Sequence, residues 1–287
     1  MRTFLFAVMV ALLATAVVPA FIGRPRLLHR DAHTFNPINV HLRELLQHKP
    51  IVLTNAQRLA RGLSLARPHF PRSDEPGTAT PSSGSAGTAP TATCTAHIGS
   101  LNITGGSYTG SYVAAQANIY GEYGYTTSDA DALQAQYTLC DGDAANGPLN
   151  IRTLNGLTTY PYFGAVVGFA STSDDFSEDS YTYAYIAGTT ESDPGATPQS
   201  GLNAFTAATG TPRDFESAVW VFDAATTGAV SAQWINPDGS KPKTHLMYVP
   251  SSGAFAIASN VPAFEANFKN VTEVSFTFAE ASASAVQ

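Results

Sequence analysis

The sequence predicts an all-β fold over residues 94–281, an antiparallel β-sandwich of jelly-roll type. Short runs of β-branched and aromatic residues recur throughout this part, separated by turn pairs such as Asn155-Gly156 and Asp238-Gly239. Long stretches with apolar residues at helical spacing are missing from it. Many short strands with frequent turns between them are typical of sandwiches and barrels.

The predicted strands alternate in a way that assigns side chains to faces. Residues 180–186 read Ser-Tyr-Thr-Tyr-Ala-Tyr-Ile, which places Tyr181, Tyr183 and Tyr185 on one face of a strand. The full set of expected strands is 95–104, 111–120, 132–139, 149–154, 162–171, 180–189, 202–208, 217–223, 229–235, 244–249, 253–258 and 270–279.

The first twenty residues have the three parts of a secretory signal peptide. Arg2 supplies the positive charge, residues 4–18 are apolar, and Pro19-Ala20 provides small residues at the cut. We expect cleavage after Ala20, with Ala16 and an uncleaved anchor as the alternatives. Later spanning runs and a C-terminal lipid-anchor signal are missing, so the mature protein is expected to be extracellular and free of the membrane.

Charge divides the rest of the chain into two parts. Ten basic residues stand against four acidic ones through residue 93, and five against 18 after it, which gives +6 and −13. Residues 21–72 form a basic leader, a candidate propeptide, with short helices expected at 40–47 and 55–61. Residues 73–93 read as a Pro/Ser/Thr/Gly-rich flexible linker, and 282–287 as a tail. We expect the basic leader to dock on the acidic domain during export.

Two kinds of motif agree with secretion. Cys94 and Cys140 are the only cysteines, and an oxidising compartment favours a disulfide between them over a zinc site. Asn102 and Asn270 each begin an Asn-X-Thr triplet, the acceptor of N-linked glycans.

Catalytic motifs are weak throughout. The domain has two histidines, His97 and His245, and no Gly-X-Ser-X-Gly elbow, so ordinary hydrogen-bonded histidines are the favoured interpretation. A glycosidase needs two facing carboxylates, for which the candidates are Glu122, Asp129, Asp131, Asp214 and Glu216. The acidic runs 174–179 and 141–143 do not match a calcium loop and read as solvated turns. We expect no metal, no cofactor and, from the −13 charge, no nucleic acid partner.

Aromatic residues are the strongest hint of function. Rings on a sheet face can stack on sugars, and the candidate ligand-binding residues are Tyr181, Tyr183, Tyr185, Trp220 and Trp234. The alternative is that these rings form a half-buried sheet face. The sequence therefore predicts a secreted protein that binds extracellular glycan or cell-wall polymer through exposed aromatics. A polysaccharide hydrolase and a structural or interaction protein without ligand are the alternatives.

Several segments resemble an uncharacterised family of secreted proteins from mushroom-forming fungi. The leader segment 53–63 (LTNAQRLARGL) carries the resemblance, with 121–125, 160–171, 216–220 and 233–239 in the domain. The resemblance covers most of residues 53–278 and implies a secreted fungal protein. It implies no activity and no catalytic residues. The chain departs from a fungal propeptide in having no dibasic pair at the end of the leader, where Pro71-Arg72 stands.

Overall fold

The computed structural model describes residues 34–47, 93–140, 147–223 and 228–281. The signal peptide, the expected helix 55–61, most of the linker, the acidic run 141–143 and the tail lie outside the described residues. Residues 34–47 belong to the same compact unit as the sheet. No helix in the described part of the chain is long and apolar enough to cross a membrane.

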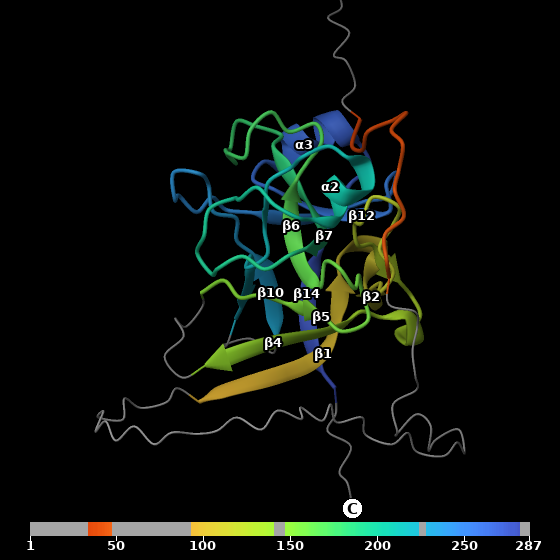
Figure 1. Ribbon diagram of the computed structural model, residues 1–287, viewed down its shortest axis with the longest axis vertical. Helices are drawn as coiled ribbons and strands as arrows, with labels where there is room; N and C mark the ends of the chain where they lie inside the picture. The colour runs from red at the N-terminus through yellow and green to blue at the C-terminus, as the bar shows by residue number, and fades with distance from the viewer. Residues whose placement is uncertain (1–33, 48–92, 141–146, 224–227, 282–287) are drawn as a thin grey trace, which may run out of the picture. The chain divides into compact units, whose positions relative to one another are not determined.

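The described strands pair into a single antiparallel sheet (Figure 1). Its main path runs in the order β13-β11-β12-β7-β6-β5-β4-β1-β14-β10-β9, with β2, β3 and β8 attached at its sides. The strands are β1 (Cys94–Thr104), β2 (Ser111–Val113), β3 (Tyr125–Thr126), β4 (Gln134–Cys140), β5 (Arg152–Thr153), β6 (Tyr162–Val167), β7 (Tyr183–Thr189), β8 (Phe215–Glu216), β9 (Trp220–Phe222), β10 (Ala229–Ala232), β11 (His245–Val249), β12 (Ala254–Ala258), β13 (Thr272–Glu273) and β14 (Ser275–Glu280).

The predicted antiparallel all-β class is confirmed, while the division into two packed sheets gives way to one strongly curled half-barrel. Strand β1 shows how the curl arises. Its residues 94–100 pair with β4, residues 99–104 pair with β14, and residues 102–103 pair with β2 on the side that β4 has left. Because β1 pairs with different strands along its length, the sheet can bend there while the hydrogen bonding between strands continues, and no edge is left unpaired at the bend.

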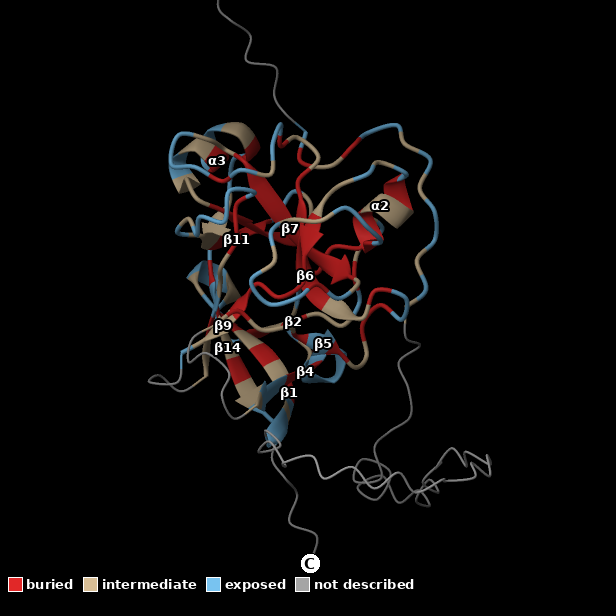
Figure 2. Cartoon of the chain, turned by 60° about the vertical axis from the view of Figure 1, so that its left-hand side comes forward, coloured by how far each residue is buried: buried red, intermediate tan, exposed pale blue. Residues whose placement is uncertain are grey.

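Strands β6, β7, β12 and β11 are covered on both faces (Figure 2). In β7, Ala184 and Ile186 join the main core with Trp220, whereas Tyr183 and Tyr185 join a second core on the opposite face. Strands buried on both sides lose the alternation of apolar and polar residues that a half-exposed strand keeps. The strand 183–189 is buried at every position.

Two short helices cover the second face, α2 (Ala204–Thr209) and α3 (Val261–Phe268). The side chain of Asn203 caps α2 by accepting from the Thr206 N–H, and Gly210 ends it in a left-handed conformation. The sequence prediction of a strand at 202–208 is therefore wrong. Helices this short span about two turns, so periodicity gives them little signal. The asparagine that caps the start of each helix and the glycine at the end of α2 carry more information.

The disulfide between Cys94 and Cys140 is confirmed. The two residues are directly opposite each other in the antiparallel pairing of β1 with β4. The bond therefore closes the outer end of this strand pair, where both strands reach solvent.

Residues 34–47, called the strap below, run across the domain without helix, bent at residues 35–36 and 38–39 and free of bends from residue 40 on (red-orange in Figure 1). The helix expected at 40–47 does not form. Instead the Arg43 N–H donates to the Ala208 carbonyl at 2.9 Å, and the Thr158 N–H donates to the Leu46 carbonyl at 3.0 Å. A helix of this length is unstable by itself, and backbone bonds to the domain stabilise the non-helical form instead.

Candidate binding site under the N-terminal strap

The side chain of Phe35 is inserted into an aromatic pocket on the second face of β7. Its ring stacks on Tyr183 with centroids 5.0 Å apart and meets the ring of Tyr185 edge-on at 5.0 Å. Phe264 and Phe268 of α3 close the other side at 6.3 and 5.4 Å. Phe35 is only 6% exposed, and burial of a phenylalanine stabilises a contact by about 1.5–3 kcal/mol.

The backbone of Phe35 is held as specifically as its ring. The Tyr183 hydroxyl donates to the Phe35 carbonyl oxygen at 2.7 Å, and the Tyr185 hydroxyl donates to the same oxygen. Each phenol in turn accepts from a loop N–H, Tyr185 from Phe169 at 2.9 Å and Tyr183 from Ala170 at 3.4 Å. Burial raises the pKa of both phenols, so both remain protonated donors.

A buried carboxyl group lies beside this pocket. Glu122 is fully buried, and its Oε2 accepts from Asn118 Nδ2 at 2.8 Å and from Asn36 Nδ2 of the strap at 3.0 Å. Burial raises the pKa of Glu122 to about 7 against the lowering effect of these amide donors. Within the described residues, Glu122 Oε1 and Asn36 Oδ1 are buried without a hydrogen-bond partner.

Asn118 holds the carboxyl group in position. Its Oδ1 accepts from the N–H groups of Tyr120 and Glu122 at 2.9 and 3.1 Å, which leaves its Nδ2 to face the carboxylate. The Tyr120 hydroxyl donates to the Pro37 carbonyl at 3.2 Å. The turn at 118–122 thus contacts two consecutive strap residues, Asn36 and Pro37.

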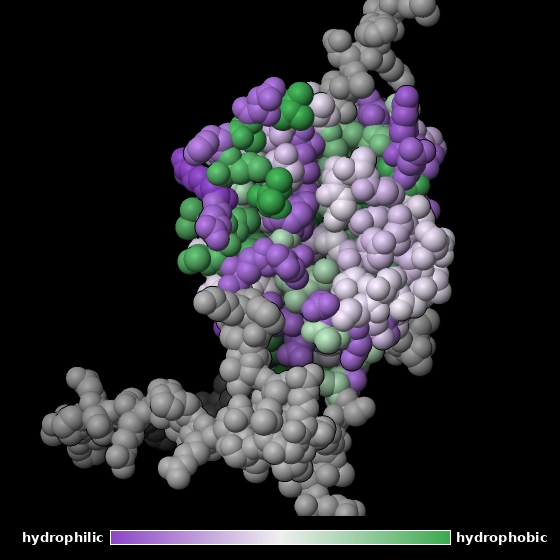
Figure 3. All heavy atoms as spheres, turned by 90° about the vertical axis from the view of Figure 1, so that its right-hand side faces the viewer, coloured by the Kyte–Doolittle hydropathy of each residue, from purple (hydrophilic) through white to green (hydrophobic). Residues whose placement is uncertain are grey.

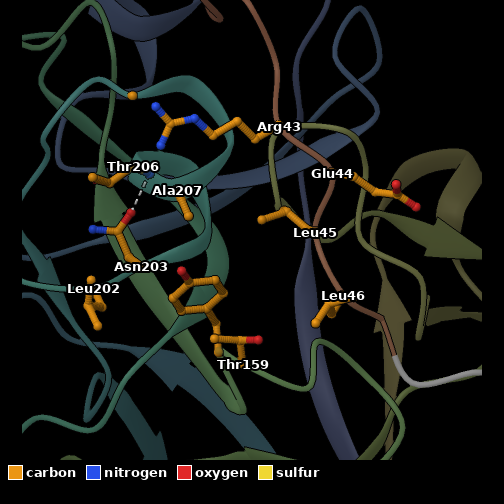
Figure 4. Close-up of a pocket in the computed structure, with 11 residues that line it drawn as sticks. Arg43, Glu44, Leu45, Leu46, Thr159, Leu202, Asn203, Thr206 and Ala207 are labelled. Carbon is orange, nitrogen blue, oxygen red and sulfur yellow. Dashed lines mark hydrogen bonds between the residues drawn. The ribbon is translucent and has the colours of Figure 1, made fainter.

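The second half of the strap borders a groove of about 580 Å³ between residues 43–46 and α2 (Figure 4). Leu45 points toward Ala207 across this groove, and Glu44 points away from it. Gly121 has φ 81°, and a Cβ built on it would lie 2.9 Å from Leu45 Cδ1 and 2.3 Å from the Cβ of Ala204. A glycine is therefore required where the strap, the turn and α2 meet.

Charge does not hold the described part of the leader on the domain, and the rest of the basic leader, residues 21–33 and 48–72, lies outside the described residues. The ion pairs of the described residues join His97 to Glu280 and His245 to Glu273, and neither involves the strap. The face that carries the strap mixes hydrophobic and hydrophilic side chains (Figure 3). The strap is held by an aromatic ring, phenol hydroxyls, an amide and backbone bonds, which salt screens far less than surface charges.

The predicted sugar-stacking residues are mostly inside the protein. Tyr183, Tyr185, Trp220 and Trp234 are each 0% exposed, so the expectation that they lie at the surface is wrong. Tyr181 is half-buried, and its hydroxyl donates to the Ala170 carbonyl. The alternation did place Tyr183 and Tyr185 on one face of β7, but α2, α3 and the strap cover that face.

The two tryptophans belong to the core. Trp220 stacks on Phe163 with centroids 4.9 Å apart, and its Nε1 donates to the Phe163 carbonyl. Trp234 stacks on Phe176 at 4.9 Å, and its Nε1 donates to the Asp174 carbonyl at 2.9 Å. Both indole N–H groups are satisfied by backbone oxygens, as buried tryptophans require.

The candidate catalytic carboxylates differ in burial and in the groups that they contact. Glu216 is 1% exposed and accepts from the Ile235 N–H, and burial raises its pKa to about 9. Asp214 makes a side-chain hydrogen bond with Asp174, whose pKa is raised by burial first and then by Asp214. Direct contact between two carboxyl groups is shorter than either glycosidase spacing, about 5–5.5 or 6.5–9.5 Å. Asp129 and Asp131 are exposed on the 3-10 helix η2 (Asp129–Asp131), and Glu122 faces the strap.

The remaining predicted sites are all at or near the surface. The Nδ1 atoms of His97 and His245 are hydrogen-bonded to Glu280 Oε1 and Glu273 Oε1 at 2.7 and 2.6 Å. Asn270 is exposed in a turn after α3, whereas Asn102 is half-buried within β1 and its Oδ1 is buried. No group of three or more His, Cys, Asp or Glu residues in the described ranges is arranged to hold a metal ion.

A cluster of tyrosines that the sequence analysis did not single out lies nearer the surface. Tyr108, from the 3-10 helix η1 (Gly106–Tyr108), contacts Tyr125 and Tyr248 with centroids 4.9 and 4.5 Å apart. Tyr125 is 39% exposed. Burial, with Tyr108 and Tyr125 beside it, raises the pKa of Tyr248 to about 12. These residues come from three separate segments, so only the folded chain brings them together.

Comparison of the chain with protein-family models, with curated proteins and with solved structures gives no match.

Proposed function

We propose that this protein is a secreted, non-catalytic binding protein whose ligand site is the pocket that the strap fills. The observation that carries the proposal is the set of contacts at Phe35. Its ring stacks on Tyr183, its carbonyl oxygen accepts from the Tyr183 hydroxyl, and the next side chain, Asn36, donates to Glu122. The strap acts as a ligand supplied by the chain itself, and its departure would open the site. Secretion is supported by the signal-peptide pattern and by the disulfide.

The exposure of the strap favours a bound segment over a permanent part of the core. Ile38 and Leu46, two of its largest apolar side chains, are 69% and 70% exposed. A core segment would bury such residues, whereas a bound peptide anchors itself at a few positions. The hydrogen bond from Tyr183 to Phe35 spans 148 positions of sequence, and residues 73–92 between them have linker composition.

The test is whether the strap opens independently of the sheet, measured by native-state hydrogen exchange on the full chain. The Arg43 amide reports on the strap, and the Phe255 amide, which donates to the Tyr123 carbonyl, reports on the core. We expect the Arg43 amide to exchange by local opening, far faster than the Phe255 amide.

Phe35→Ala should speed exchange at Arg43 by at least about 100-fold, since loss of a buried phenylalanine costs about 3–5 kcal/mol. Exchange at Phe255 should change little. Leu46→Ala is the matched control in the exposed part of the strap. Equal acceleration at Arg43 and Phe255 would show that the strap is core, and the proposal would fail.

Glycan binding remains a second candidate, now at a different place from the predicted one. The tyrosine cluster of Tyr108, Tyr125 and Tyr248 favours it, because Tyr125 exposes ring surface above two supporting rings. A glycan array with the secreted chain and with Tyr125→Ala is the test. Binding that Tyr125→Ala leaves unchanged would exclude this cluster.

A further inference from the structure

The contacts of the strap define what else the pocket can accept. Resting on the function proposed above, we propose that the pocket recognises a bent, non-helical peptide in which an aromatic residue is directly followed by asparagine or glutamine. Such a peptide would be a segment of another protein and would compete with the strap.

The aromatic position is selected by shape. Tyr183, Phe264 and Phe268 surround the ring of Phe35 on different sides, with centroids 5.0 to 6.3 Å away. An aliphatic side chain would keep some apolar contact but lose the stacked and edge-on ring arrangements. The pocket should therefore prefer phenylalanine to leucine.

The peptide backbone is recognised through its carbonyl. The hydroxyls of Tyr183 and Tyr185 both donate to the Phe35 oxygen, and loop N–H groups orient them. These bonds exist for any residue at this position. They supply affinity for the peptide backbone and fix its position, so that the next side chain reaches Glu122.

The following position is selected by charge and hydrogen-bond type. Glu122 presents a buried carboxyl oxygen to the Nδ2 of Asn36, and only a donor satisfies it. The other groups that face this carboxyl are Asn118 from its own turn, which also donates to it, and the two phenols of β7. None of these carries a positive charge, and Arg213, the cation near Tyr183, donates to the carbonyls of Phe169 and Ser171. Above pH 7, where Glu122 is ionised, aspartate should therefore be rejected, and alanine should leave Glu122 with one donor fewer.

The experiment uses the full chain carrying Phe35→Ala and Asn36→Ala, so that its own strap no longer fills the pocket. The probe is a synthetic peptide of residues 33–40 (HTFNPINV) with blocked ends, and binding is measured by isothermal titration calorimetry. We expect this peptide to bind the variant and to bind the unaltered chain more weakly, since the intact strap competes.

Changes in the peptide test each recognition step. Asn36→Asp and Phe35→Ala in the peptide should each weaken binding by roughly 10- to 100-fold. Ile38→Ala is the control, because Ile38 is 69% exposed, and it should bind like the parent. In a chain that also carries Glu122→Gln, the difference in affinity between the parent peptide and the Asn36→Asp peptide should shrink.

Each outcome supports or overturns the proposal. Equal binding of the parent and Asn36→Asp peptides would show that Glu122 does not select the carboxamide. If no peptide binds, the proposal that the pocket recognises an aromatic residue followed by asparagine or glutamine is overturned. The proposal that the strap covers a ligand site would still stand if hydrogen exchange shows that the strap opens. If the double variant does not fold, Phe35→Ala alone replaces it, since it removes the ring from the pocket and leaves the hydrogen bond from Asn36 to Glu122 in place.

Discussion

Glu216→Gln should make the stability of the domain much less sensitive to pH. Glu216 is 1% exposed, and burial raises its pKa from the ordinary value of 4.5 to about 9. A carboxyl group that binds its proton more tightly in the folded chain than in the unfolded chain favours the folded state in acid. That contribution is fully present below pH 4.5 and is lost as the pH rises toward 9.

The size of the loss follows from the shift in pKa. One unit corresponds to about 1.4 kcal/mol, so the free energy of unfolding should fall by about 3 kcal/mol between pH 4.5 and pH 7, and by about 6 kcal/mol by pH 9. Glu122 contributes in the same direction, by about 3 kcal/mol up to pH 7, because its pKa is raised to about 7. The protein should therefore be most stable in mild acid.

The assay is urea unfolding at pH 5 and pH 8, with the disulfide intact, on the parent chain and on Glu216→Gln. The glutamine side chain of this variant keeps an oxygen for the Ile235 N–H and cannot ionise, so its pH dependence should retain only the contribution of Glu122 and the surface groups. Glu265→Gln, at an exposed position of α3, is the matched control and should follow the parent. Parallel pH dependence of the parent and Glu216→Gln would refute the reasoning.

Two further predictions concern the covalent features of the domain. Replacing Cys94 and Cys140 together by serine should lower the free energy of unfolding, measured with urea, by about 4 kcal/mol, because the disulfide closes a loop of 46 residues in the unfolded chain. A loss under about 1 kcal/mol would show that residual pairing of β1 with β4 already restricts the unfolded chain. In the secreted chain, Asn270→Gln should remove the mass of one glycan and Asn102→Gln should not, because Asn270 is exposed and Asn102 lies between β2 and β14. Mass spectrometry measures the difference, and a glycan on Asn102 would contradict the pairing of β1 with β2 and β14.

The longer strands were anticipated because their signal is local, whereas β3 and β8, of two residues each, fall outside every expected run. The run 244–249 contains β11, 253–258 contains β12, and 180–189 contains β7. The disulfide was anticipated too, since two cysteines in an exported chain have few alternatives. The misassigned run 202–208 shows the limit: six residues from Ala204 to Thr209 are too few for a helical period, and the Asn203 cap carries the information instead.

The binding site could not be anticipated in the same way. The alternation at 180–186 correctly placed Tyr183 and Tyr185 on one face, but whether that face meets solvent depends on Phe264 and Phe35, which lie far away in the sequence. Glu122 similarly looked like any acid of an acidic domain. Only its burial beside Asn118 and Asn36 separates it from the carboxylates that face water.

Composition and short-range pattern were thus sufficient to predict many of the antiparallel strands and the cysteine pair, and they predict the export signal, because each of these depends on neighbouring residues or on a count. Tertiary structure decided which face of β7 is covered, that the strap is not helical, and that its Phe35 and Asn36 meet phenols and a buried carboxyl group. Those contacts join segments more than 80 positions apart, and no local pattern encodes the free energy of packing between them.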